Sequence, residues 1–414
     1  MIYKRLVPQD SFLGRYLQYM ETQETAYVYD WWCGLWCLSC ACQRSCYVDR
    51  PRAPVYLNMY VVLVGESGVA RKTTSVSVAS RLVHPLLRDA SVGLVDAKCT
   101  PERLDEMLME RTLEHGYAHM CITCPELAVI LGTESYIATM PVLLTDLYDC
   151  PTIRMGGGTV SRGTVLQENV WVNLLSASTP VWLLKAVNPN VVEGGFTSRT
   201  YFIVAHEPKR KIPWPEHGDL TLFQDMQDDL RIISNEARTH GHISLNNAGM
   251  SRFTEWYTSK PRSLDPFKQT FEAREDAHVL RIAALLCIND GSWTIRRGHI
   301  SVAIKLINQM KEQSGVIFET AEARSKFASG LDVVRAQLVS AGMDPVLRSQ
   351  LYNKVRNHLN YNEFTTLLEV LHEIRAIQRF EVRTGERGRP AEWIRGTNLL
   401  LARGLGENVL ERLV

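Results

Sequence analysis

Short apolar runs alternate with amphipathic stretches from about residue 59 to residue 205, and this alternation is the strongest pattern in the chain. The apolar runs are rich in β-branched residues and are bounded by turn residues, which is typical of strands. They lie at 59–64, 91–97, 118–123, 170–177 and 200–205. Because the stretches between them have helical spacing, we expect a parallel α/β sheet.

The pattern changes after the proline- and lysine-rich segment 208–219. Apolar residues then recur with helical spacing and without strand signals, which predicts a bundle with helices at 220–240, 265–290 and 297–325. We therefore expect the chain to have four parts. These are an N-terminal helical segment packed on the core (1–58), the α/β core (59–215), a helical lid or bundle (216–327) and a C-terminal domain (328–414).

The C-terminal part contains three short helical patterns at 331–342, 345–359 and 362–377. Two alternating stretches around a glycine-rich turn follow in 379–396, which predicts a β-hairpin. This order of elements indicates a winged helix. Such a domain can bind DNA or another protein, and both roles stay open here.

Half of the ten cysteines lie in one run between Cys33 and Cys46. A zinc site would need a second pair of cysteines after a folded loop, and no second pair follows this run. Small and aromatic residues are placed within the run as in a tightly packed helix, where cysteine acts as a small hydrophobic residue. We therefore expect a packing role, with a metal site or disulfides as the alternatives.

A glycine-containing loop, GESGVARKTT (65–74), joins the first strand of the predicted sheet to a helix. A nucleoside triphosphate requires converging backbone N–H groups at a helix N-terminus, a cation for its outer phosphates and a hydroxyl for Mg²⁺. Lys72 and Thr73 fit the last two roles. Arg71 stands where the pattern GxxxxGK[ST] has its final glycine, so a surface turn is the alternative. The residues expected to bind ATP in this loop are Gly65, Ser67, Gly68, Arg71, Lys72, Thr73 and Thr74.

ATP hydrolysis also needs a carboxylate that polarises the attacking water. Glu126 follows the strand at 118–123 and is the candidate, with a helix-start glutamate as the structural alternative. The apolar strand at 170–177 ends in Ser176, Ser178 and Thr179, which places three hydroxyls at the same edge of the sheet, where one of them can sense the γ-phosphate. The alternative role for Thr179 is the N-cap of a helix that begins at Pro180.

Two arginines are candidates for nucleotide contacts from outside the loop. Arg199 follows a turn at Gly194 and Gly195 and directly precedes a strand, so we expect its guanidinium to point outward as an arginine finger for the adjacent subunit. A surface ion pair is the alternative. Arg281 lies on an otherwise apolar helix, where it either senses nucleotide from the lid or caps the bundle surface.

Two glycine-turned hairpins carry the residues expected to contact DNA. The first, TIRMGGGTVSRGTVLQ (152–167), has Arg154 and Arg162 on its arms and can follow a nucleic-acid backbone in the pore of a ring. A solvated β-ribbon is the alternative. The second is the wing, which contains Arg383, Arg387, Arg389 and Arg395. Glutamates on the preceding helix disfavour deep insertion into the major groove, so we expect weak sequence specificity.

The overall charge does not identify a partner, because 46 Lys and Arg nearly balance 45 Asp and Glu and leave a formal net charge of +1. DNA binding would depend on local basic patches instead. No run of roughly 18 apolar residues occurs without charges, and the N-terminal residues lack the apolar core of a signal peptide. We therefore expect no membrane partner and a cytoplasmic location.

Four phrases of the core, taken together, resemble those of a known family. NMYVVLVGESGVARKTT, CPELAVIL followed by LLTDLYDCP, NLLSASTPVWL and GGFTSRTYFIV occur in that order within about residues 15–325. In this set the chain is similar to the phage and plasmid P-loop family of replication-associated ATPases, found alone or fused behind primase domains as helicases. The arginine–lysine doublet of the loop resembles the doublet found in the P-loops of that family. The resemblance implies a RecA- or AAA-like core, ATP hydrolysis between subunits and a role on DNA during phage or mobile-element replication.

The sequence thus predicts an ATP-driven, hexameric, helicase-like motor that uses ATP and Mg²⁺ on single-stranded or forked DNA. A primase or another replication protein is an expected partner. Two alternatives stay open: a nucleotide-gated DNA-binding initiator or loader, and an ATPase switch in a phage-related regulatory or defence complex. Measurable ATP turnover separates the motor from the loader, and turnover that is independent of DNA favours the switch.

Overall fold

The computed structural model describes residues 7–51, 53–131, 139–156, 165–186, 195–214, 218–260, 266–382, 391–401, 409 and 412–413. The chain divides into two compact units, which comprise residues 1–315 and residues 316–414. Three of the four parts expected from the sequence therefore share the first unit. The second unit begins at residue 316. The sequence pattern had predicted that the C-terminal domain begins at residue 328.

Five parallel strands form the central sheet of the first unit, in the order β4–β5–β8–β3–β9. Their bounds are β3 Tyr60–Val64, β4 Gly93–Val95, β5 His119–Cys124, β8 Trp171–Ser178 and β9 Thr200–Val204. The predicted parallel α/β sheet is confirmed, and all five predicted strands belong to it. Because the strands run in one direction, their C-terminal ends share one edge, here called the carboxyl edge, and their N-terminal ends share the opposite amino edge.

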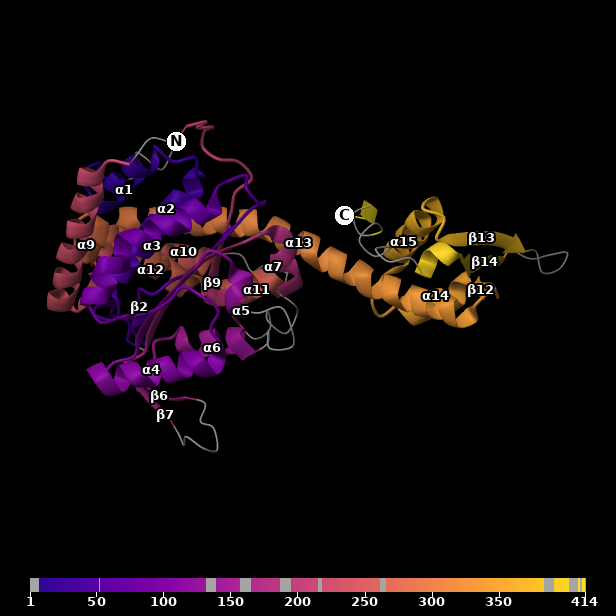
Figure 1. The fold of residues 1–414 in the computed structure, drawn as a ribbon, viewed down its shortest axis with the longest axis horizontal. Coiled ribbons are helices and arrows are strands. Elements are labelled where there is room, and N and C mark those ends of the chain that lie inside the picture. The colour runs from indigo at the N-terminus through magenta and orange to yellow at the C-terminus, as the bar shows by residue number, and fades with distance from the viewer. Residues whose placement is uncertain are drawn as a thin grey trace. The chain divides into compact units, whose positions relative to one another are not determined.

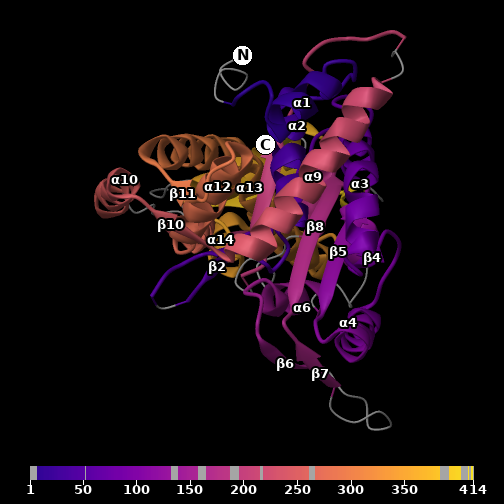
Figure 2. The same ribbon diagram turned by 90° about the vertical axis from the view of Figure 1, so that its left-hand side faces the viewer.

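Helices cover both faces of this sheet, as right-handed crossovers between parallel strands require. On one face, α2 (Tyr27–Cys42) packs against α3 (Lys72–Asp89). Figure 2 shows α9 (Leu220–His240) lying along these two helices, and α1 (Phe12–Met20) also contacts α2 and α9. The other crossovers contain α4 (Pro101–His115), α5 (Leu127–Leu131), α6 (Thr139–Leu147) and α7 (Pro180–Ala186).

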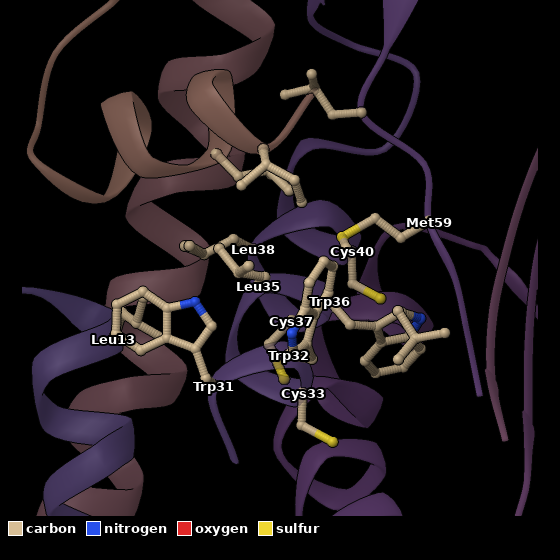
Figure 3. Packing of buried hydrophobic residues seen from close by; sticks show 14 of the residues in the cluster. Leu13, Trp31, Trp32, Cys33, Leu35, Trp36, Cys37, Leu38, Cys40 and Met59 are labelled. Carbon is tan, nitrogen blue, oxygen red and sulfur yellow. The ribbon is translucent and has the colours of Figure 1, made fainter. Parts of the chain in front are cut away.

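The cysteine-rich run forms α2, the most deeply buried helix of the core. Its three tryptophans are buried, as are Cys33, Cys37, Cys40 and Cys42, and each of these cysteines is a free thiol. Figure 3 shows labelled side chains of α2, among them Trp31 and Cys40, in one cluster with Leu13 of α1 and with Met59, which precedes β3. Because α2 is buried on nearly all sides, it has no polar face, and its small cysteines fit between larger neighbours. The predicted packing role is confirmed.

A second sheet of the first unit has four very short strands in the order β11–β10–β1–β2. Their bounds are β1 Tyr47–Val48, β2 Val55–Tyr56, β10 His242–Leu245 and β11 Thr294–Ile295. The prediction that the region 216–327 contains helices without strands is therefore wrong. Strands this short cannot show an alternating pattern, so periodicity could not reveal them. The sheet joins the N-terminal segment, which supplies β1 and β2, to the predicted bundle.

The predicted bundle contains α9, α10 (Asn247–Ser259), α11 (Pro266–Glu272), α12 (Glu275–Asn289) and the long helix α13 (Arg297–Ala341). α9 has the predicted bounds, whereas the single helix predicted at 265–290 is divided into α11 and α12. The separate helix predicted at 331–342 is also wrong, because α13 continues through these residues. Gly330 is a weak stop signal, since a glycine inside a helix costs only about 1 kcal/mol.

A β-hairpin projects from the first unit next to α4 and α6 in both ribbon views (Figures 1 and 2). Its arms are β6 (Ile153–Gly156) and β7 (Val165–Glu168), which pair in antiparallel fashion. The predicted hairpin is therefore confirmed in its arms. Its tip, which includes Arg162, lies outside the described residues.

The second unit begins within α13 and then contains β12 (Val346–Leu347), α14 (Arg348–Val355), α15 (Tyr361–Glu373), β13 (Ile377–Val382) and β14 (Ala391–Gly396). β14 lies between β12 and β13 and is antiparallel to both. A capping box formed by Asn360 and Glu363 fixes the start of α15. The predicted wing residues Arg383, Arg387 and Arg389 lie outside the described residues.

Candidate functional site

The backbone turns sharply at Gly65, directly after β3. Its N–H donates to the Ser178 carbonyl at 3.3 Å, which ties the start of the loop to the end of β8. A Cβ atom at this position would lie 2.6 Å from the Tyr29 hydroxyl and 2.7 Å from the Ala205 carbonyl oxygen. Only glycine fits between these two groups without a shift of backbone. The Tyr29 hydroxyl also donates to the Val64 carbonyl at 2.6 Å, so α2 fixes the backbone at the start of the loop.

Residues 66–69 and Arg71 of the loop are exposed, and two residues of the loop have the left-handed conformation. Gly68 has a φ of 76° and Arg71 has a φ of 51°. Arg71 therefore adopts the conformation that the glycine of the usual pattern would favour, at some cost in strain. Its guanidinium contacts Glu24 at 3.3 Å. Ser67 lies at the exposed part of the loop, so its backbone is accessible to a ligand.

Lys72 begins α3 and folds back over the loop. Its ammonium group donates to the carbonyl oxygens of Gly65 at 2.6 Å and of Glu66 at 2.9 Å. Burial lowers the pKa of Lys72, and the negative charges of Glu126 and Glu66 oppose this effect. Both of its partners are neutral carbonyls, which phosphate oxygens can replace with stronger, charge-assisted bonds.

The first turn of α3 supplies the hydroxyl groups expected near the phosphates. Thr73 is exposed and Thr74 is half-buried. The first N–H groups of a helix lack intrahelical partners, and the helix dipole places partial positive charge at the same end. This end of α3 therefore suits an anion, and Thr73 can offer its hydroxyl to a bound cation.

Glu126 lies at the carboxyl edge with its side chain exposed, directly before α5. It follows β5, and β8 separates that strand from β3. With strands about 4.8 Å apart, the ends of β3 and β5 lie roughly 10 Å from each other. Glu126 nevertheless acts on the pKa of Lys72, so the two charges share this edge. The structure brings together the loop, Lys72 and Glu126 as the sequence predicted.

The two predicted sensor residues both have structural hydrogen bonds. Thr179 Oγ1 accepts a hydrogen bond from the Trp182 N–H at 3.3 Å, which makes Thr179 the N-cap of α7. The capping alternative is therefore confirmed. Ser178 is buried at the end of β8, and its hydroxyl donates to the Thr179 carbonyl at 3.2 Å. Both residues lie at the carboxyl edge.

Ser176 was expected among the hydroxyls of this edge, whereas Asp96 and Tyr29 were not found by sequence reasoning. The Ser176 hydroxyl donates to the Cys124 carbonyl at 2.6 Å and fixes the end of β5 against β8. Asp96 follows β4, and its charge contributes to the raised pKa of Cys124, whose largest cause is burial. Its place after an apolar run was a signal of the same kind as that of Glu126. Tyr29 lies far from the loop in sequence and offered no such signal.

Arg199 lies at the amino edge, which corrects the expectation that it points outward. It directly precedes β9 and is only 8% exposed. Its guanidinium donates to the Asp149 carboxylate and to the Gly195 carbonyl, both at 3.1 Å. The length of β3, five residues or roughly 16 Å, separates this edge from the loop. Within one chain, Arg199 therefore cannot contact a nucleotide held by Lys72.

Arg281 also lies at the amino edge and is 4% exposed. Its Nε donates to the Tyr56 carbonyl at 2.9 Å, and its guanidinium carbon lies 4.9 Å from the centre of the Tyr148 ring. Both expectations for this residue are wrong, because it neither lies by the loop nor caps an exposed surface. An arginine within an apolar helix was a signal of burial that its charge obscured.

The residues expected to contact DNA are placed differently from one another. Arg154 on β6 pairs with Asp105 at 2.6 Å and also binds Asp146 and Gln167. Its guanidinium is thus held internally, which disfavours the predicted contact with a nucleic-acid backbone. Arg395 on β14 lies over the Phe380 ring, 5.2 Å from its centre. The other four predicted arginines lie outside the described residues.

No protein-family model and no curated protein matches the chain. None of the helices in the described part of the chain is long and apolar enough to cross a membrane. Within the same part, no three His, Cys, Asp or Glu side chains are grouped so that they can hold a metal ion. The function is therefore argued from the geometry of the carboxyl edge.

Proposed function

We propose that this protein is a P-loop ATPase that acts as a DNA motor. One observation carries the proposal. A loop that begins at Gly65 runs from β3 into α3, Lys72 donates to a carbonyl of this loop, and Glu126 lies at the same edge of the sheet. A phosphate-binding loop, a cation for the outer phosphates and a carboxylate across the edge are what ATP hydrolysis requires. The five-stranded parallel sheet is compatible with the RecA- or AAA-like core implied by the resemblance.

Each group at this edge has a role in the proposed reaction. Lys72 moves from the loop carbonyls to the outer phosphates, and Glu126 accepts a proton from the attacking water. Thr73 would hold Mg²⁺ through its hydroxyl. Bound Mg²⁺ neutralises charge on the phosphates.

The proposed role of Arg199 as an arginine finger requires an assembly of several copies. An arginine at the amino edge reaches a nucleotide at the carboxyl edge only if a second copy presents its amino edge there. Such head-to-tail contacts are heterologous and close into a ring when the rotation permits. We propose that ATP is hydrolysed between subunits of such a ring, of which a hexamer is the expected form.

The second unit supports a role on DNA. Its order of elements, a helix, a short strand, two helices and a hairpin, is compatible with the winged helix that we propose for it. The wing carries the arginine-rich sequence 383–395, which suits phosphate contacts of low sequence specificity. We propose single-stranded or forked DNA as the substrate during phage or mobile-element replication in the host cytoplasm, with a primase or another replication protein as partner.

A nucleotide-gated DNA-binding platform is the second candidate function, and one observation favours it. Arg154 and Arg199, which the motor would use on DNA and on nucleotide, are both bound to carboxylates of their own chain. A protein that uses nucleotide only to assemble on DNA would not need either side chain to be released.

ATP turnover with and without single-stranded DNA tests the proposal. The natural chain should hydrolyse ATP faster with DNA, and Lys72→Ala and Glu126→Gln should each lower turnover by about a hundredfold or more. Lys305→Ala, which removes an exposed lysine of α13, is the matched control and should leave turnover unchanged. Absence of turnover from the natural chain, with assembly on DNA still driven by nucleotide, would contradict the motor and support the platform.

A further inference from the structure

A cavity of about 200 Å³ lies at the amino edge, bordered by the chain before β3, the end of α6 and α12. Its polar lining includes Arg50, Tyr56, Asn58, Tyr148, Asp149 and Arg281. This volume corresponds to roughly six water molecules at about 30 Å³ each, which is enough for a small anion. The cavity is separate from the P-loop, because β3 runs between the two places.

Arg281 brings a positive charge to this cavity without a partner of opposite charge. Its burial and its contacts with Tyr56 and Tyr148 fix the guanidinium in place. Among the described residues, no carboxylate forms an ion pair with it. Removing a charge from water is strongly unfavourable unless a counter-charge accompanies it. An anion bound in the cavity would therefore stabilise the buried charge of Arg281.

The histidine beside Arg281 does not neutralise its charge. His278 Nδ1 lies 3.4 Å from the guanidinium, and the histidine is neutral because burial, together with the Arg281 charge, lowers its pKa to about 3. His278 Nε2 must carry the proton, since it lies 2.8 Å from the Ser198 carbonyl, which can only accept. Nδ1 then accepts from the Tyr201 hydroxyl at 2.6 Å.

The carboxylates around the cavity are already bound. Asp149 binds Arg199 at 3.1 Å and Arg274 at 3.2 Å, one through each carboxylate oxygen. Arg50 pairs with Asp276 at 2.8 Å. Together with the buried guanidinium, four arginines therefore share two carboxylates around the cavity. The local charge is positive, although the chain as a whole is nearly neutral.

Two neutral polar atoms of the lining also lack partners. The Asn58 amide group donates to the carbonyls of Tyr148 at 2.8 Å and Val172 at 3.4 Å, but its Oδ1 has no hydrogen-bond partner among the described residues. The Tyr148 hydroxyl approaches that of Tyr201, whose pKa burial raises and this contact lowers, but it reaches no group of the described residues with full hydrogen-bond geometry. Both residues are buried, so these atoms are costly unless a ligand binds them.

We propose that this cavity binds a small oxyanion of the phosphate class. Its oxygens accept hydrogen bonds from the Arg281 guanidinium and the Tyr148 hydroxyl, and the protonated oxygen of hydrogen phosphate donates to Asn58 Oδ1. Binding joins α12, which carries Arg281, to the chain before β3, which carries Asn58. The site stands independently of the ATPase function proposed above.

Calorimetric titration with inorganic phosphate at constant ionic strength tests this site. The titration uses the full chain with Lys72→Ala, because a P-loop also binds phosphate and would obscure the result. We expect saturable binding of one phosphate per chain. Tyr148→Phe removes only the unpartnered hydroxyl, so the chain should fold, and the dissociation constant should rise roughly tenfold. Tyr257→Phe, which alters an exposed tyrosine of α10, is the control and should change nothing.

A second variant and two further anions sharpen the result. Arg281→Lys keeps the charge but loses the forked geometry, so it should weaken phosphate binding at least as much as Tyr148→Phe. Sulfate lacks the proton for Asn58 and should bind less tightly than phosphate at pH 7. Displacement of phosphate by a nucleoside monophosphate identifies a phosphate monoester as the natural ligand, and no displacement identifies free phosphate. Absence of saturable binding, or binding that neither variant changes, would overturn the proposal.

Discussion

The two edges of the central sheet hold their charged groups in different ways. At the carboxyl edge, Glu126 is exposed and Lys72 binds only carbonyl oxygens of its own loop. At the amino edge, Arg199 and Arg281 are buried and contact side chains from distant parts of the chain. The carboxyl edge thus offers an exposed carboxylate and a buried lysine that is bound to neutral groups, whereas the arginines of the amino edge are bound by residues from distant parts of the chain.

This difference shows what a local sequence motif can predict about the position of its residues in the fold. In a parallel sheet, a residue that follows a strand lies at the carboxyl edge, and a residue that precedes one lies at the amino edge. Glu126 follows β5, whereas Arg199 precedes β9. The two residues therefore act at one nucleotide only between different copies of the chain.

The largest effect on ATP turnover is expected when Gly65, the first residue of the loop, is replaced by alanine. Gly65→Ala places a Cβ atom 2.7 Å from the Ala205 carbonyl, so the backbone must shift, and a shift of about 1 Å at a reacting group can cost a hundredfold in rate. We expect ATP turnover to fall by that amount. Gly68→Ala meets no atom within 4 Å and strains only its φ of 76°, so its cost should be about 1 kcal/mol. Equal losses in the two variants would contradict this account of the loop.

A smaller effect is expected at the amino edge when His278 is charged by acid. Its pKa is about 3 in the fold, against 6.5 for an ordinary histidine, so the unfolded chain binds more protons between these values. The free energy of unfolding should therefore fall as the pH is lowered, and His278 contributes about 2–3 kcal/mol of this loss between pH 6.5 and 4.5. Denaturant unfolding of the natural chain and His278→Gln at several pH values measures this contribution.

The comparison of the two curves isolates His278 from other groups that titrate in this range. His119, whose pKa burial also lowers to about 3, has the same sign and remains in both proteins. Asp30 has the opposite sign, because burial raises its pKa to about 6 and its contribution weakens as the pH rises through that range. An unchanged slope in His278→Gln would show that His278 is not neutral in the fold.

The smallest expected effect concerns Arg281 and nucleotide. Because Arg281 lies at the opposite edge from the loop, Arg281→Lys should change the dissociation constant of ATP by less than about twofold. A residue that bound the phosphates through a charged hydrogen bond would cost about tenfold or more when altered. Fluorescence titration with a labelled nucleotide measures this constant. A tenfold weakening without a change in stability would place Arg281 at the nucleotide after all.

The central sheet could be predicted from the sequence because its strands are apolar and bounded by turns. The loop at 65–74 and Glu126 could be predicted for the same reason, since each directly follows such a strand. The four-stranded sheet could not, because β1 and β11 are only two residues long. The break between α11 and α12 also has no proline or glycine to announce it.

The environment of the arginines could not be predicted, because it depends on contacts between distant residues. Asp149, which binds Arg199, lies 50 positions away in the sequence, and Tyr56, which binds Arg281, lies 225 positions away. A sequence pattern describes neighbours along the chain, so it could suggest that Arg199 is important but could not identify its partner. The choice between the two roles of Thr179 depended on a local contact, the hydrogen bond that its hydroxyl accepts from the Trp182 N–H.

The central claim is that the carboxyl edge of one copy and the amino edge of another form one ATP site. Mixing two variants tests it most directly: Lys72→Ala keeps Arg199, and Arg199→Ala keeps Lys72. Each should be inactive alone. In a ring assembled at random from equal amounts, about a quarter of the interfaces unite an intact Lys72 with an intact Arg199. We predict that the mixture regains ATP turnover toward about a quarter of the natural rate, whereas turnover no higher than the average of the two variants would contradict the account.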